Sequence, residues 1–590
     1  MKGPPLPVPE HRTINEALEA AAATPSGITF VDLHERETFV PFVEIRARAG
    51  RTAAGLLRKG VRPRDRVALV FPTSPEFLDA YFGAMLAGAV PVPLYPPFRL
   101  GRLPEYHAAT ARMIGASGAC LVLADARTRT LLGQAVERSR PRLGCATLEE
   151  IGQRSSEEAH ATVEPGSLAV IQFSSGSTAD PKPIALSHAS LTAQLAALKS
   201  LLPPEDRFRQ LGVSWLPLYH DMGLIGCLLL AVYYPGPLVL IPPELFLVRP
   251  ALWLRAIARH RATLSVSPTF GYAFSAKRVR DEDVAGLDLS SWRLAVCGAE
   301  PISIAALQAF SERFAPLGFR PSALRPVYGL AETSLAVTFS PPDRPPRALG
   351  VDPARLAASG EAVPGTRAIA SVGTPVPGAE LEVRGSTGRR LRERRVGRIF
   401  TRGPSLMTAY FGQQEATAGA IRDGWLDTGD LGFVADGELY VCGREKDLVI
   451  IRGANHVPQE FEECLDRLEG VRPGCSVALG FVPEGEDGEQ LLVLAERARA
   501  AARDDGDAGT VEAIRRAVLE HTGIKPHTVR LLEPGTLPRT SSGKLRRSEA
   551  LRRFLAGELA PPRKAGAARI SAEMLRSAVA FARVKLRRAR

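Results

Sequence analysis

The chain has 590 residues, which is too long for one hydrophobic core, so we expect at least two domains. Its 45% hydrophobic and 23% charged residues are typical of a soluble globular protein. Residues 561–590 contain nine Arg or Lys and one Glu, a net +8, and the remaining 560 residues account for only +4 of the formal net charge of +12. The main domains are therefore not expected to bind nucleic acid.

No targeting or membrane-spanning segment is expected from the sequence. Residues 1–9 lack a continuous apolar run of the kind found in secretory signals. The longest apolar stretch, residues 222–243, is broken by Pro235-Gly236-Pro237 into pieces too short to span a bilayer. The seven cysteines include no CxxC pair, which indicates neither a zinc site nor a disulfide framework. Together these features predict a cytoplasmic protein.

Strands and helices alternate in the first part of the chain. Helical spacing in residues 12–60 surrounds a short strand at 28–31, and residues 66–71 form a second strand. A capped helix from Ser74 to Ala87 leads into another strand that begins at Ala89. This alternation predicts an α/β fold with a doubly wound sheet.

The next segment resembles a binding site for a polyanion. Residues 168–173 read as a buried strand, and Lys182 follows closely. Between them stand five small residues that supply hydroxyl and amide groups: Ser174, Ser175, Gly176, Ser177 and Thr178. Such a loop can surround phosphates, although it lacks the Walker A spacing, and the alternative is an ordinary Ser/Gly loop. Ser187 is expected to cap the helix that follows.

Three further segments place polar side chains near the ends of expected strands. The pair His220-Asp221 could orient a carboxylate beside an apolar cavity, or be a core histidine with a capping aspartate. Glu300 follows a strand and a glycine turn, and could also be only a cap. Tyr328 could stack on a base, and Glu332 could hold Mg²⁺, because loops at strand carboxyl ends line the ligand crevice of open α/β sheets.

The second half of the chain changes character. Residues 338–371 form a Pro/Arg/Ala-rich insertion, and residues 373–443 alternate strand-like runs with glycine turns, which predicts an antiparallel β subdomain. Asp430 lies in a tight turn there, where its carboxylate could accept two ribose hydroxyls. A charged turn at 443–452 is a plausible hinge before a second domain. Lys544 ends a hydroxyl-rich loop in that domain, and the alternative is a solvated basic loop.

Taken together, these motifs resemble the adenylate-forming superfamily of acyl-CoA synthetases, peptide-synthetase adenylation domains and luciferases. Six of them occur in the family's order, and the resemblance covers about residues 12–550. The segment Ser214 to Gly226 is most similar to the fatty acyl-AMP ligase branch. That branch is also supported by the 338–371 insertion and by residues 246–250, 287–292 and 452–460.

The resemblance implies a large N-terminal domain of two doubly wound subdomains and a β subdomain (1–443), a small mobile α+β domain (444–555) and a basic tail (556–590). It implies that residues 174–178 and Lys182 bind the β- and γ-phosphates of ATP, and that Glu332 binds Mg²⁺. The expected nucleoside site consists of Gly298, Ala299, Glu300, Tyr328, Gly329, Asp430 and Arg444. His220 would border the acyl carboxylate, Lys544 would bridge that carboxylate and the α-phosphate, and Lys446 would be the pivot of domain rotation.

The reaction implied is ATP-dependent activation of a medium- or long-chain fatty acid, followed by transfer to the phosphopantetheine thiol of an acyl carrier protein. An acyl-CoA synthetase is the first alternative. A non-catalytic acyl-adenylate or lipid-binding protein is the second, because Ala179 and Pro183 stand where the family usually has glycine.

No motif accounts for the tail. As a helix at about 100° per residue, residues 571–590 would place Arg576, Arg583, Arg587 and Arg590 on one side. An apolar sector would lie beside them: Leu575, Val579, Ala582 and Leu586. This pattern predicts contact with an anionic membrane surface or an acidic carrier protein. The alternative is a solvated, frayed terminus.

Overall fold

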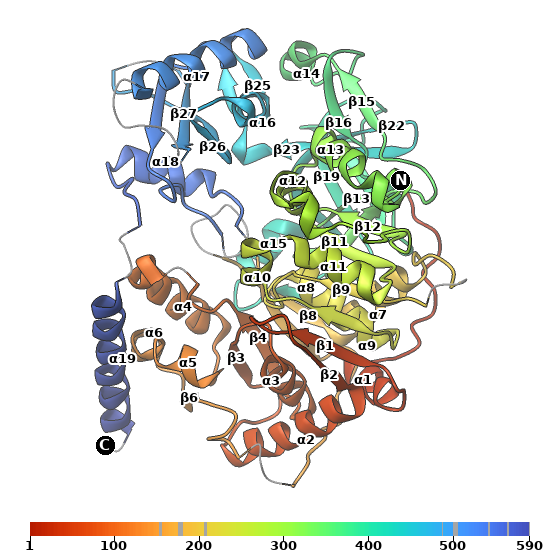
Figure 1. Cartoon of the computed structure of the whole chain (residues 1–590), viewed down its shortest axis with the longest axis vertical. Coiled ribbons are helices and arrows are strands. Elements are labelled where there is room, and N and C mark those ends of the chain that lie inside the picture. Colours follow the sequence, from red (N-terminus) through yellow and green to blue (C-terminus); the bar gives the residue numbers. More distant parts are fainter. Residues whose placement is uncertain are drawn as a thin grey trace.

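The structure is a computed structural model that describes residues 1–98, 100–152, 156–174, 181–205, 209–485, 488–498, 506–540, 543–562 and 566–588. A large N-terminal domain fills most of the molecule, a small C-terminal domain sits on one end of it, and the last helix lies along its outer edge (Figure 1). None of the helices within the described residues is long and apolar enough to cross a membrane.

The first α/β subdomain is built on a four-stranded parallel sheet of order β4-β3-β5-β6. Its strands are β3 (Arg66–Val70), β4 (Val90–Leu94), β5 (Leu121–Ala124) and β6 (Gly144–Ala146). The accompanying helices are α2 (Phe42–Arg58), α3 (Pro75–Leu86), α4 (Leu103–Ser117), α5 (Ala126–Arg129) and α6 (Gly133–Ser139). Helix α3 begins after Ser74 as expected, but the Ser74 hydroxyl makes no capping hydrogen bond.

A nine-stranded sheet forms the centre of the N-terminal domain, in the order β17-β14-β13-β12-β11-β9-β10-β1-β2. Its strands are β1 (Gly27–Val31), β2 (Glu37–Pro41), β9 (Gly212–Ser214), β10 (Leu238–Leu240), β11 (Leu264–Ser267), β12 (Leu294–Cys297), β13 (Leu324–Gly329), β14 (Ala336–Phe339) and β17 (Thr374–Pro375). The inner strands from β1 to β13 are parallel, and the pairings at both edges are antiparallel. The predicted α/β class is confirmed.

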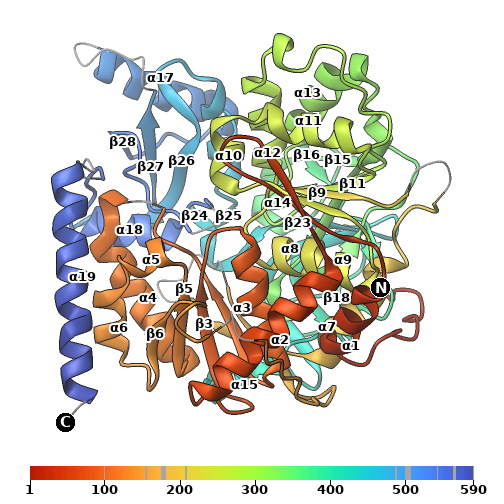
Figure 2. The same ribbon diagram turned by 60° about the horizontal axis from the view of Figure 1, so that its bottom comes forward.

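Helices surround this sheet, and their apolar faces form the main core (Figure 2). They are α1 (Ile14–Ala22), α7 (His188–Lys199), α8 (Asp221–Gly223), the π-helical turn η2 (Leu224–Leu229), α9 (Leu230–Tyr233), α10 (Pro243–Val248), α11 (Ala251–His260), α12 (Thr269–Arg278) and α13 (Ile304–Phe314). Helix α7 begins at the capping box of Ser187 and Ser190, as the sequence predicts, and it is buried along nearly its whole length.

A small antiparallel sheet holds the ends of the hydroxyl-rich loop. Strands β7 (Leu168–Phe173), β8 (Pro183–Ser187) and β20 (Ala409–Tyr410) pair in the order β20-β8-β7. Pro183 is the first residue of β8, a position at which a strand tolerates the missing N–H group. The substitution of proline for glycine is therefore compatible with the fold at this point.

The β subdomain contains the expected antiparallel sheet. Its strands are β18 (Glu380–Arg384), β19 (Gly397–Arg402), β21 (Ile421–Arg422), β22 (Trp425–Ala435) and β23 (Glu438–Arg444), with helix α15 (Gln414–Ala420) beside them. Within the insertion, a hairpin of β15 (Ala348–Val351) and β16 (Arg367–Ala370) encloses α14 (Pro353–Ser359).

The C-terminal domain has a three-stranded sheet of order β26-β27-β28 and a separate two-stranded hairpin. Its elements are β24 (Val449–Ile451), β25 (Ala454–His456), α16 (Gln459–Glu462), β26 (Val471–Phe481), β27 (Gln490–Arg497), α17 (Gly506–Thr522), β28 (Thr528–Leu532) and α18 (Arg547–Leu555). Helix α16 has four residues and is followed by a 3₁₀ turn at Leu465–Arg467.

Two sets of contacts fix the small domain on the large one. On one side, Arg367 of the insertion forms a 2.6 Å ion pair with Glu460. An apolar cluster continues this contact: Val351, Leu356, Ile369, Leu448 and Val457. On the other side, Arg102 donates to the carbonyl oxygens of Gly535 and Thr536.

The tail forms helix α19 (Ala567–Arg588), which lies against α6 (Figures 1 and 2). The Gly133 amide donates to Ser577 Oγ over 2.7 Å, and Gln134 donates to the carboxylate of Glu573 over 3.0 Å. Ser577, Glu573 and Ala580 are buried. The alternative of a frayed terminus is therefore wrong for residues 567–586. The Arg587 side chain and residue Arg590 lie outside what the structure describes.

Candidate active site

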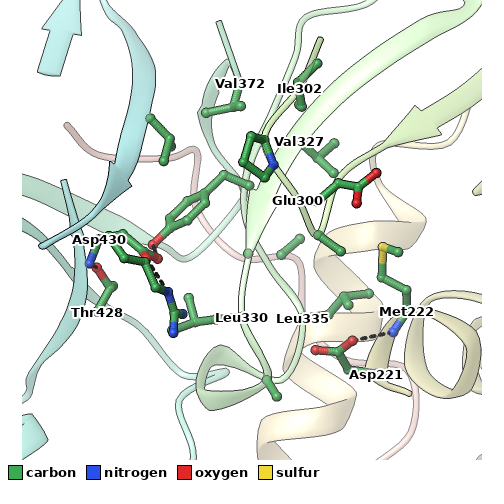
Figure 3. Close-up of a pocket in the computed structure, with 18 of the residues that line it drawn as sticks. Asp221, Met222, Glu300, Ile302, Val327, Leu330, Leu335, Val372, Thr428 and Asp430 are labelled. Atoms are coloured by element: carbon green, nitrogen blue, oxygen red, sulfur yellow. Dashed lines mark hydrogen bonds and ion pairs between the residues drawn. The ribbon is translucent and has the colours of Figure 1, made fainter. Parts of the chain in front are cut away.

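One large cavity, with a volume of about 830 Å³, lies between the two domains. It is bordered by the ends of β7, β12 and β13, by β22 and β23 of the β subdomain, and by a turn of the C-terminal domain. Asp430 lies on one side of the cavity, and Asp221 and Glu300 lie on the other (Figure 3). Segments more than 350 residues apart in the chain thus form a single site.

The hydroxyl-rich loop opens onto this cavity at both of its ends. Ser174 and Lys182 line the cavity and are joined by two hydrogen bonds, from the Ser174 amide to the Lys182 carbonyl and from the Lys182 amide to Ser174 Oγ. The predicted phosphate ligands Ser175, Gly176, Ser177 and Thr178, and the departure at Ala179, lie outside the described residues. The two described ends of this segment therefore lie at the cavity wall.

Glu332 lies near Lys182 in the same part of the cavity. Its carboxylate accepts a 2.9 Å hydrogen bond from the Tyr410 hydroxyl. The Lys182 ammonium sits over the Tyr410 ring, 4.3 Å from the ring centroid. Burial raises the pKa of Glu332, while the Tyr410 hydroxyl and the charges of Arg444 and Lys182 oppose that rise.

Asp430 is the centre of a polar corner built on two paired strands. Asp430 in β22 stands directly opposite Arg444 in β23, and the Arg444 guanidinium donates to Asp430 Oδ1 over 2.8 Å. The Tyr328 hydroxyl donates to Asp430 Oδ2 over 2.7 Å, so both carboxylate oxygens are held in place. The Asp430 charge raises the pKa of Arg444, against the effect of burial. We call Tyr328, Asp430 and Arg444 the ribose corner, after the ribose that Asp430 and Arg444 are expected to hold.

The turn after β12 forms another part of the wall. Ala299 adopts a left-handed φ of +70°, and Glu300 accepts a 2.6 Å hydrogen bond from the Phe270 amide. Gly298 faces the Val327 side chain and is not among the residues that line the cavity. Gly329 does line it, and a Cβ there would overlap the Leu335 carbonyl, so only glycine fits.

His220 and Asp221 begin α8 at the opposite side of the cavity. His220 Nδ1 lies 2.6 Å from Asp221 Oδ1, and the Met222 amide donates to the same carboxylate oxygen. Burial favours the neutral form of Asp221, but the charges of His220 and Lys544 outweigh it and lower the Asp221 pKa. His220, and not Asp221, is the N-cap of α8, and both residues line the cavity. The role of the pair in orienting a carboxylate stays a prediction.

Lys544 reaches this cavity from the C-terminal domain. Its backbone is held in a tight turn in which the Thr540 amide donates to the Lys544 carbonyl and the Lys544 amide donates to Thr540 Oγ1. Burial lowers the pKa of Lys544, and the carboxylates of Asp221, Glu300 and Asp430 oppose that shift. The ammonium thus lies among the carboxylates of the large domain.

Lys446 lies where the chain passes from one domain to the other. It is in a 3₁₀ turn, Glu445–Asp447, between β23 and β24, and it also lines the cavity. Burial lowers its pKa, and the nearby charge of Arg444 adds to the effect. Lys446 thus lies at the crossing point between the domains, and its role as the pivot of domain rotation stays a prediction.

An apolar arm extends from the charged part of the cavity. It is lined by side chains from α7, α8, α9 and β11 and by Gly226 of η2, a π-helical distortion of a kind that occurs frequently at functional sites. The lining includes Leu198, Leu201, Met222, Leu230, Leu264 and Val266. Met222 and Leu335 lie close to Asp221 in Figure 3, so the apolar arm begins beside the polar groups.

Sequence reasoning missed one residue that the structure places at the centre of the site. Tyr410 contacts both Lys182 and Glu332, yet the residues around it, Thr408 to Gly412, look like an ordinary strand end. Its importance depends on the pairing of β20 with β8, which joins segments more than 220 residues apart. No local pattern could have shown this.

Comparisons with known proteins agree with this geometry. Residues 18–411 match the family of AMP-binding enzymes. A putative acyl-CoA synthetase of Caulobacter vibrioides is 36% identical over 563 residues, covering 92% of this chain and 96% of the relative. JamA of Moorena producens, a medium-chain-fatty-acid–[acyl-carrier-protein] ligase, is 33% identical over 86% of this chain and 89% of its own length.

A solved structure from a study of fatty acyl-adenylate ligases of E. coli and L. pneumophila superposes with a TM-score of 0.87. It is 34% identical in sequence, and the match covers 94% of this chain and 99% of the solved one. Because the family match spans well over half of the sequence and whole-length relatives exceed 30% identity, the chain belongs to the AMP-binding family of adenylate-forming ligases.

Proposed function

We propose that this enzyme activates a fatty acid with ATP to an acyl-adenylate and pyrophosphate, and then transfers the acyl group to the phosphopantetheine thiol of an acyl carrier protein. The observation that supports it most is the single cavity in which an apolar arm meets Lys544, Lys182 and the ribose corner. An apolar arm suits an alkyl chain, and the charged part of the cavity suits a nucleoside triphosphate.

In the first step, a carboxylate oxygen of the fatty acid attacks the α-phosphorus of ATP, the bond to the bridging oxygen breaks, and pyrophosphate leaves. The negative carboxylate must approach the negative triphosphate of ATP, so the enzyme mainly neutralises charge and aligns the reactants. Lys544 would lie between the carboxylate and the α-phosphate. Lys182 and the hydroxyl-rich loop would bind the leaving pyrophosphate, and Asp430 would accept the ribose hydroxyls.

Mg²⁺ fits the site as a partner of Glu332. Among the described residues, no group of three or more His, Cys, Asp and Glu side chains could enclose a metal ion. Mg²⁺ in nucleotide sites is usually held by one or two carboxylates together with phosphate oxygens and water, which Glu332 can provide with its substrate. When bound, the ion would supply charge neutralisation at the phosphates.

The acceptor distinguishes two forms of the proposal. A carrier protein is favoured by the JamA relative and by the insertion, which contacts the small domain through Arg367 and Glu460. That contact would restrain the domain rotation needed for reaction with CoA. An acyl-CoA synthetase remains the alternative, since the relative from C. vibrioides has that name.

The proposal is tested by fatty-acid-dependent release of pyrophosphate across a panel of carboxylic acids. Wild-type protein should release pyrophosphate, Lys544→Ala should not, and Lys525→Ala, a matched exposed lysine in the same domain, should behave as wild type. Loading of holo carrier protein should exceed acyl-CoA formation. Rapid acyl-CoA production would instead assign the enzyme to the synthetases, and absence of pyrophosphate release would indicate a binding protein.

We also propose that α19 contacts an anionic membrane surface, where fatty acids partition. Helix α19 exposes Leu575, Val579 and Leu586 (68%, 44% and 67%). The exposed residues Arg576 and Arg583 pair with Glu573 and with Glu137 of α6. An apolar stripe flanked by arginines suits acidic lipids. Vesicles with anionic lipid should bind wild type more tightly than Leu575→Glu/Leu586→Glu. Equal vesicle binding, with weaker carrier-protein loading in the variant, would point to the carrier protein.

A further inference from the structure

Tyr410 makes contact with both charged groups expected at the phosphates of ATP. Its hydroxyl donates to Glu332 Oε1 over 2.9 Å, and its ring lies under the Lys182 ammonium at 4.3 Å. All three residues line the cavity. The tyrosine therefore contacts a carboxylate and an ammonium at the same time.

The backbone around Tyr410 holds it firmly in this place. Tyr410 pairs with Ile184 in β8, and Lys182 comes directly before the first residue of that strand, Pro183. The Tyr410 amide donates to Thr417 Oγ1 over 3.0 Å. The residue as a whole is only 5% exposed. A side chain fixed by a sheet and by burial can fix the mobile groups that touch it.

We propose that Tyr410 is a positioning residue for the triphosphate of ATP, and this inference rests on the proposed adenylation. Its hydroxyl orients the Glu332 carboxylate, and its ring holds the Lys182 ammonium by a cation–π contact. Each contact is weaker than a direct Lys182–Glu332 ion pair, so both groups remain available to the nucleotide and its cation. The two parts of one side chain thus serve two different partners.

Two substitutions separate these parts. Tyr410→Phe removes the hydroxyl and keeps the ring, whereas Tyr410→Leu removes both. Tyr440→Phe is the matched control, because it removes a buried tyrosine hydroxyl that has no hydrogen-bond partner within the described part of the chain and does not line the cavity. The measurement is the calorimetric Kd for ATP without fatty acid, once with EDTA and once with Mg²⁺.

In EDTA, Tyr410→Phe should bind ATP within about twofold of wild type, because Lys182 keeps its ring contact. The strengthening of ATP binding by Mg²⁺ should fall about tenfold in this variant, because Glu332 is no longer oriented. Tyr410→Leu should bind ATP about tenfold more weakly in EDTA as well. Combining Tyr410→Leu with Lys182→Met should add little to the EDTA loss, since the ring acts through Lys182.

The inference is overturned if Tyr410→Leu binds ATP as wild type does in EDTA, or if Tyr410→Phe already shows the whole loss there. It is also overturned if the effects of Tyr410→Leu and Lys182→Met add fully. The unfolding temperature of Tyr410→Phe, which nearly preserves the side-chain volume, is measured to check that this variant is folded. This variant then tests the role of the hydroxyl by itself. These outcomes concern ATP binding and are distinct from failure of the proposed function, which absence of fatty-acid-dependent pyrophosphate release in wild type would reveal.

Discussion

The ribose corner and the Lys544 side chain border the same cavity, but they are built in different ways. The ribose corner lies within the large domain, where strand pairing sets Asp430 opposite Arg444 and each carboxylate oxygen already has a donor. Lys544 belongs to the other domain and enters the cavity only because that domain is docked. One part of the site is therefore a feature of the fold, and the other is a feature of the domain arrangement.

This difference predicts that damage to the two parts will appear in different measurements. Loss of the ribose corner should affect stability and nucleotide affinity together, since its residues join strands of the large domain and would also bind the proposed substrate. Loss of Lys544 should affect the rate alone, since burial lowers its pKa and the fold gains nothing from the charge.

The largest expected effect belongs to Lys544→Ala. Removing the ammonium that would bridge carboxylate and α-phosphate should lower kcat/KM for acyl-adenylate formation by about a thousandfold. The unfolding temperature should stay the same or rise, because a buried charge is removed. Pyrophosphate release and calorimetry measure the two quantities, and a destabilised variant with a near-normal rate would contradict the division between the two parts.

A smaller loss of rate, accompanied by a loss of stability, is expected for Asp430→Asn. The KM for ATP should rise by about thirtyfold as the ribose loses a charged acceptor. The free energy of unfolding should fall by only about 1–2 kcal/mol, because the Arg444 side chain is 37% exposed and solvent screens the pair. Steady-state kinetics and urea unfolding test both values, and unchanged stability would show that the corner is not structural.

Arg367→Ala should loosen the docking of the small domain without changing the ribose corner. The side chains of Arg367 and Glu460 are only 12% and 6% exposed. Removing Arg367 would leave the buried Glu460 carboxylate without this partner and would weaken the contact between the domains. We expect adenylation to fall about fivefold and acyl-CoA formation to rise, while the Kd for ATP is unchanged. Arg355→Ala, in the same insertion but paired with Glu361 inside it, is the matched control. Equal rates of adenylation and of acyl-CoA formation in the two variants would show that the insertion does not contribute to the domain contact.

The smallest effect is a shift in pH dependence. Lys544 acts as an ammonium, and its pKa is lowered by burial, so the rate of adenylation should decline with rising pH at a lower pH than an ordinary lysine would give. Lys544→Arg keeps its charge and should lack this alkaline decline, even though its overall rate is reduced. The same alkaline decline in both proteins would assign it to another group.

The sequence predicted the strand-end motifs well because each is a local run of residues. Lys544, Asp430 and Glu332 all line the cavity, as the resemblance implied. Tyr410 was not found, because its role arises from the pairing of distant strands. Prediction from the sequence is limited for a physical reason. A local pattern depends on the residues that are close in the sequence, and it does not show which residues lie opposite in the sheet.

The tail shows the same limit in another form. The spacing predicted a helix with a leucine-rich sector, and the structure has that helix. The buried face is nevertheless the one with Glu573 and Ser577, whereas Leu575 is exposed. The reason lies in α6, where Gly133 has no side chain and lets Ser577 approach closely. A helical pattern can show two faces, but only the partner decides which of them is covered.

The seating of α19 on α6 also limits how far the small domain can travel. Eleven residues separate the end of α18 at Leu555 from the start of α19 at Ala567. A fully extended segment of that length reaches about 40 Å at most. As long as α19 stays packed against α6, the length of this segment therefore limits the distance that Lys544 can move. In the proposed reaction, Lys544 would be able to leave the nucleotide while the small domain stays attached near the active site.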